Sequence, residues 1–121
     1  MAASLADVLQ ELQVSNGLDM AALVSADGLV IDAAAVGEID VESICSVASN
    51  GLLVMGSLGQ ELGEDAAEML TVEYGRHIVI MAPFEQEHLL VLLAGSGVNL
   101  GRMRIVLRRR MDALAEAMEN V

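Results

Sequence analysis

Apolar residues recur at helical spacing in three segments of the chain. After Ser4, a good helix N-cap, the apolar positions of residues 4–14 fall three or four apart and predict a short amphipathic helix. The same spacing returns over residues 40–62 and again from Leu100 to Met118. These segments are therefore predicted to form a first, a middle and a terminal helix.

Between these helices the apolar residues form short runs typical of strands. Two runs flank residues 26–28, where Asp and Gly favour a tight hairpin turn. Three further runs between the middle and terminal helices are separated at residues 74–76 and 84–87, and Pro83 stands where the second of them ends. The order is α-β-β-α-β-β-β-α, and the short connections favour one five-stranded antiparallel sheet in a single-domain α+β sandwich over residues 1–121.

The middle helix is more apolar than one sheet face requires. Residues 43–60 carry no charge, and the apolar side of the helix spans roughly 200° of arc. A membrane span is the first alternative, but six Ser, Asn and Gln side chains argue against insertion. Because little of a 121-residue domain remains to bury this surface, we expect self-association through Ile44, Val47, Ala48, Gly51, Leu52, Met55 and Leu58.

A second stripe of the middle helix is polar but uncharged. It contains Ser46, Asn50, Leu53, Ser57 and Gln60. On a helix expected to associate, such a stripe with one apolar anchor fits a docking surface, although a solvated face explains it as well.

Composition and charge exclude several classes of function. The net charge is -12, with six arginines and no lysine, and only 2% of residues are aromatic. Nucleic acids and anionic membranes reward dense positive charge, so neither is an expected partner. Cys45 is the single cysteine, and the N-terminal sequence lacks the features of a signal peptide, so a cytoplasmic protein is expected.

Five of the six arginines are concentrated between Arg102 and Arg110. On a helical wheel Arg104 and Arg108 flank one side of the apolar stripe and Arg102 and Arg109 the other. The favoured interpretation is that the guanidinium groups pair with acids such as Asp7 or Glu11 of the first helix. A catalytic arginine finger is the alternative, but a finger needs a mobile loop rather than a helix.

No pattern predicts a catalytic, cofactor or metal site. The glycine-rich turn at residues 94–101 lacks the lysine of a phosphate-binding loop. His77 and His88 have no third ligand at a spacing that would bind a metal, and Cys45 lies among apolar neighbours, typical of an inert thiol. An enzyme is therefore not expected.

The chain resembles the roadblock-domain family, which includes dynein roadblock light chains and bacterial MglB-like proteins. The resemblance is carried by the element order, by "GLDMAALVSADGLVIDAA", by the uncharged middle helix and by "HLLVLLAGSGVNLGRMRIVLRR". It implies a profilin-like or longin-like fold that dimerises through the middle helix and the third strand. Leu70 and Val72 of that strand would then join the interface.

The resemblance also implies partners. Family members bind Ras-like small GTPases as scaffolds or, in some bacterial cases, as stimulators of GTP hydrolysis, and bacterial members occur beside sensor-kinase-like proteins. A homodimeric, non-enzymatic regulator of a small GTPase is therefore expected, with the polar stripe around Leu53 as the docking site. A scaffold of a signalling complex that leaves GTP turnover unchanged remains the alternative.

Overall fold

The computed structural model describes residues 3–85 and 87–119, which form four helices and five strands, the middle helix being divided into α2 and α3. The elements follow the predicted order. They are α1 (Leu5–Ser15), β1 (Met20–Ser25), β2 (Val30–Ala35), α2 (Val41–Ala48), α3 (Asn50–Leu62), β3 (Leu70–Glu73), β4 (His77–Phe84), β5 (His88–Gly95) and α4 (Leu100–Glu119).

The five strands form one antiparallel sheet in the order β2-β1-β5-β4-β3. The three central strands, β1, β5 and β4, are apolar at nearly every position because both of their faces are covered. The sheet ends at β2 on one side and at the four-residue strand β3 on the other. The predicted five-stranded antiparallel sandwich is confirmed.

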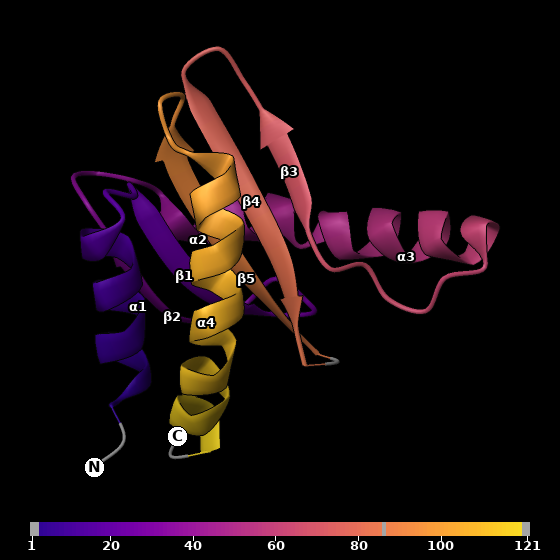
Figure 1. The fold of residues 1–121 in the computed structure, drawn as a ribbon, viewed down its shortest axis with the longest axis horizontal. Helices are drawn as coiled ribbons and strands as arrows, with labels where there is room; N and C mark the ends of the chain where they lie inside the picture. Colours follow the sequence, from indigo (N-terminus) through magenta and orange to yellow (C-terminus); the bar gives the residue numbers. More distant parts are fainter. Residues whose placement is uncertain (1–2, 86, 120–121) are drawn as a thin grey trace.

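The helices cover the two faces of the sheet unequally (Figure 1). On one face α1 and α4 lie side by side over a large core that includes Leu9, Leu90 and Leu107. On the other face α2 and the start of α3 cover a smaller core around Cys45 and Val91. The N-terminal end of α1 and the C-terminal end of α4 lie at the same end of the molecule (Figure 1).

The predicted middle helix is interrupted once. It runs as α2 and α3, which meet at Ser49, and the Ser49 hydroxyl donates to the carbonyl of Ser46 over 2.7 Å. The β1–β2 turn lies against this point, because a side chain on Gly28, whose φ is +91°, would come within 2.9 Å of the Ser49 hydroxyl. The helix predicted over residues 40–62 is therefore present as α2 and α3, and Ser49 between them keeps right-handed helical angles of φ -60° and ψ -25°.

The helix ends follow local sequence signals. Ser4 caps α1, since its hydroxyl accepts the backbone N–H of Asp7 at 3.1 Å. Asp40 caps α2 in the same way, and its hydrogen bonds with Ser43 hold the pKa of the Asp40 carboxyl below its ordinary value. Gly63 ends α3 in the left-handed conformation, which glycine adopts without steric cost.

Candidate functional site

The most unusual surface of the molecule is the exposed side of α2 and α3. Figure 1 shows α3 extending past β3, beyond the edge of the sheet. Four apolar side chains at helical spacing are exposed along these helices, with exposed fractions between 58% and 71%. They are Val47, Val54, Leu58 and Leu62, called the bare stripe below.

A hollow of about 460 Å³ lies beside the bare stripe, between α2 and the β3 edge. Its lining is mostly apolar and comprises Ser43, Ile44, Val47, Ala48, Gly51, Val72, Tyr74, Val79 and Met81. Tyr74 is itself exposed at its rim. The bare stripe and this hollow form one continuous apolar region that a folded monomer leaves in water, which is unusual unless something covers it.

By length and composition, the segment Val41–Leu62 could cross a membrane. Only 11% of its most apolar stretch is buried in the protein, so it is not an ordinary core helix. Two kinds of cover are therefore possible: a lipid bilayer or a protein surface.

The structure places the residues predicted for self-association in three environments. Val47 and Leu58 are exposed, and Met55 is 8% exposed within the core of its own protomer. The remaining ones are half-buried along the same region: Ile44, Ala48, Gly51, Leu52, Leu70 and Val72. Sequence reasoning left Val54 and Leu62 out of this set, although their helical spacing already placed them on the apolar side.

Gly51 approaches its own sheet closely. A side chain there would begin 3.1 Å from the sulfur of Met81 and 3.4 Å from Leu70. The small residue at position 51 is therefore explained by packing inside one protomer, without the approach of a second backbone.

The predicted docking stripe is solvent-exposed throughout. Its five members, Ser46, Asn50, Leu53, Ser57 and Gln60, are all exposed, and Leu53 reaches 72%. A shallow depression lined by Leu53, Val54, Ser57, Leu58 and Glu61 joins this stripe to the bare stripe. A partner seated on Leu53 would thus also contact the edge of the apolar region.

The described part of the chain offers few side chains suited to metal binding or nucleophilic attack. Residues 3–85 and 87–119 contain no group of three His, Cys, Asp or Glu side chains arranged to hold a metal ion. Cys45 is fully buried, and this burial raises the pKa of its thiol to about 11. A thiol with that pKa is almost entirely protonated at neutral pH and is a poor nucleophile.

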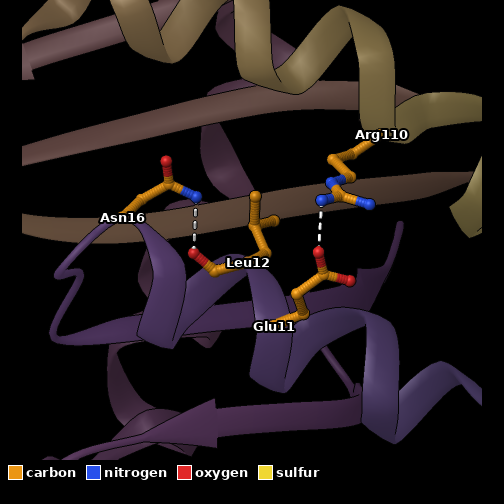
Figure 2. Close-up of polar contacts among 4 residues, drawn as sticks. All are labelled: Glu11, Leu12, Asn16 and Arg110. Carbon is orange, nitrogen blue, oxygen red and sulfur yellow. Dashed lines mark hydrogen bonds and ion pairs between the residues drawn. The ribbon is translucent and has the colours of Figure 1, made fainter.

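The arginines of α4 divide into paired and unpaired groups. Arg110 pairs with Glu11 of α1, as the sequence predicted, and Figure 2 shows this bridge between the two helices. Arg108 lies 3.9 Å from Glu68, and both side chains are largely exposed. Arg102, Arg104 and Arg109 form no ion pair with any residue that the structure describes, so the expected internal pairing holds for only part of the cluster.

Known proteins share this architecture. The fold matches MglB of Myxococcus xanthus with a TM-score of 0.86 at 22% identity, covering 97% of this chain and 96% of that one. It matches profilin of Schizosaccharomyces pombe with a TM-score of 0.65 at 17% identity, over 93% and 98% of the two chains. The expected profilin-like fold is confirmed.

Sequence comparison gives the family directly. An uncharacterized protein of Methanocaldococcus jannaschii is 32% identical over 109 residues, which cover 88% of this chain and 93% of the relative. The family model described as the Roadblock/LC7 domain matches residues 5–94. The chain therefore belongs to the Roadblock/LC7 domain family.

Proposed function

We propose that this protein is a homodimeric regulator of a Ras-like small GTPase. The observation that carries the proposal is the continuous apolar region formed by the bare stripe and the hollow beside β3. Four apolar side chains are exposed on one side of the helix, next to the edge strand β3 of the sheet. In a two-fold dimer a second copy of the same surface would cover them. Membership of the Roadblock/LC7 family supports this reading, because the family resemblance implies dimers formed through the same elements.

A protein interface accounts for the helix better than a bilayer does. The bare stripe occupies one side of α2–α3, while the adjoining side carries Ser46, Asn50, Ser57 and Gln60 in water. Each uncompensated polar side chain in hydrocarbon would be costly. A two-fold dimer buries the apolar side and leaves the polar side free.

The GTPase would dock on the polar stripe around Leu53. In a two-fold dimer the stripe is present twice, so the two copies offer a broad uncharged platform. Leu53, at 72% exposure, is the apolar anchor of that platform, and central anchors carry much of the binding energy of an interface. Docking there would act by favouring one conformation of the GTPase switch regions over another.

The substitution Leu53→Glu tests the docking site. The side chain is exposed, so the variant should fold and dimerise normally, while affinity for the GTPase falls at least tenfold, about 1.4 kcal/mol. The measurement is a titration with the Ras-like GTPase encoded nearest to this gene, with GTP turnover followed in parallel. Stimulated turnover supports a regulator, and binding without a change in turnover supports the scaffold alternative.

Val14→Glu is the matched control. Val14 is also an exposed apolar residue on a helix, but it lies on α1, on the opposite face of the sheet. Its replacement should leave GTPase affinity unchanged. An affinity that falls equally in both variants, or in neither, would contradict docking at Leu53.

A further inference from the structure

A second groove lies on the opposite face of the sheet from the bare stripe. It has a volume of about 900 Å³ and runs between α4 and the β3 side of the sheet, where no helix lies in front of β3 in Figure 1. It is lined by Ala67, Glu68, Met69, Thr71, Ala82, Pro83, Arg104, Leu107, Arg108 and Met111. The dimer and docking surfaces proposed above use none of these residues.

The groove combines an apolar lining with a basic wall. Pro83 and Met111 are half-buried and supply accessible apolar surface to the floor, while Leu107, at 1% exposure, lies beneath them in the core. Arg104 and Arg108 stand one helical turn apart on the α4 wall, and both are exposed. An amphipathic ligand that carries both apolar and anionic groups would satisfy both parts of the groove.

The two arginines are poorly neutralised. Arg104 has no ion-pair partner among the described residues. Arg108 has only Glu68, at 3.9 Å and with exposed fractions of 80% and 89% for the two side chains, an arrangement worth little in water. Their positive charge is thus available to a ligand, and Glu68 acts as a weak internal competitor for it.

Charge complementarity selects the kind of ligand. The protein has a net charge of -12, and residues 1–75 contain thirteen acids and no Arg or Lys. A nucleic acid or an anionic membrane would bring dense negative charge against this acidic surface and be repelled. A short peptide segment with a few carboxylates would place its charge only at the two arginines, and its apolar side chains would fill a groove too large for a simple anion.

We propose that the groove between α4 and β3 binds an acidic peptide segment of a partner protein, with carboxylates at Arg104 and Arg108 and apolar side chains on Pro83 and Met111. This gives the molecule a second binding surface on the face opposite the GTPase platform. The proposal is independent of the proposed function, because it uses different residues.

The test uses a fluorescein-labelled eight-residue peptide of alternating Glu and Leu, titrated with the full-length protein and followed by fluorescence anisotropy. Binding should weaken at least about tenfold in the double variant Arg104→Glu/Arg108→Glu. The matched control is Arg102→Glu/Arg109→Glu, which changes the net charge equally on the same helix outside the groove and should bind nearly normally. Peptides with Gln in place of Glu, or Ser in place of Leu, should bind more weakly.

A gain-of-affinity variant guards against misfolding as an explanation. Glu68→Gln removes the competing carboxylate and should strengthen peptide binding, while Leu53→Glu should leave it unchanged. Equal loss in both double variants, no measurable binding of the Glu-Leu peptide, or no gain in Glu68→Gln would overturn the proposal. So would vesicles containing phosphatidylserine binding better than the peptide, or a higher oligomer that Arg104→Glu/Arg108→Glu abolishes, since lipid or another copy would then be the occupant.

Discussion

At the scale of single residues, an ion pair between Arg110 and Glu11 joins α1 to α4 outside the apolar core. Its side chains are 38% and 49% exposed, so water weakens the attraction without removing it. Asn16, five residues after Glu11, donates from its side-chain amide to the carbonyl of Leu12 at 2.9 Å at the end of α1 (Figure 2). The Arg110–Glu11 pair thus links α1 to α4, whereas the Asn16 hydrogen bond stabilises the end of α1 itself.

We expect Arg110→Ala to lower the free energy of unfolding by about 0.2–1 kcal/mol, the usual range for a partly exposed pair. Thermal denaturation at one protein concentration measures the loss, and a double-mutant cycle with Glu11→Ala isolates the pairwise part. GTPase binding should not change. Arg109→Ala is the control, since Arg109 has no ion pair with the described residues, and a loss as large as that of Arg110→Ala would show that the pair contributes nothing specific.

Cys45 makes stability depend on pH in the alkaline range. Its folded-state pKa of about 11 lies above the ordinary value of 9.0, so the folded protein holds a proton that the unfolded chain releases. The free energy of unfolding should therefore fall as the pH rises from 9 to 11, by at most about 1.4 kcal/mol per pH unit. Denaturant titrations across this range should show the slope in the natural protein and its reduction in Cys45→Ala.

Thiol labelling checks the same residue independently. At pH 8 a thiol reagent should modify Cys45 slowly in the folded protein and rapidly in denaturant, because the buried thiol is protonated and enclosed. Rapid labelling under folding conditions would contradict the burial of this side chain.

At the scale of elements, α2 and α3 differ in how they meet the sheet. α2 packs on the sheet through the buried side chain of Cys45. The first turn of α3 packs on the sheet where Gly51 approaches Met81 and Leu70. Farther along, α3 extends past β3 (Figure 1), and its side chains Leu58 and Leu62 are 58% and 66% exposed. Replacing Gly51 with a large residue would therefore disturb the protomer itself, so the exposed end of α3 is the better place to test association.

At the scale of the whole molecule, the bare stripe predicts a dimer. Sedimentation at micromolar concentration should give about twice the 12.7 kDa of one chain. Leu58→Glu, which places a charge in the middle of the apolar region, should give a folded monomer, because burying an unpaired charge costs several kcal/mol. Ile105→Glu, a matched change at an exposed apolar site on α4, should remain dimeric. A wild-type monomer, or a Leu58→Glu dimer, would refute the proposed interface.

Local sequence was sufficient to predict the type and order of the elements. The period of apolar residues changes from helical to alternating or continuous wherever the structure changes element, and capping residues such as Ser4 and Asp40 lie where helices begin. Glycine at position 28 marks the first hairpin because few other residues accept a φ of +91°. These are interactions between residues close in the chain, so one sequence reveals them.

Contacts between distant segments decided what sequence alone left open. The helical wheel of the middle helix places Met55 and Leu58 on the same apolar side, yet Met55 is buried in the core and Leu58 is 58% exposed. Part of α3 extends past β3, the edge strand of the sheet (Figure 1). Likewise, the helical wheel placed Arg104 and Arg108 on one side of the apolar stripe of α4, but only the tertiary structure shows that this side borders a groove and that Arg110 pairs with Glu11 of α1. The position of a sheet edge and of a neighbouring helix depends on how all the strands pair, and no short stretch of sequence encodes it.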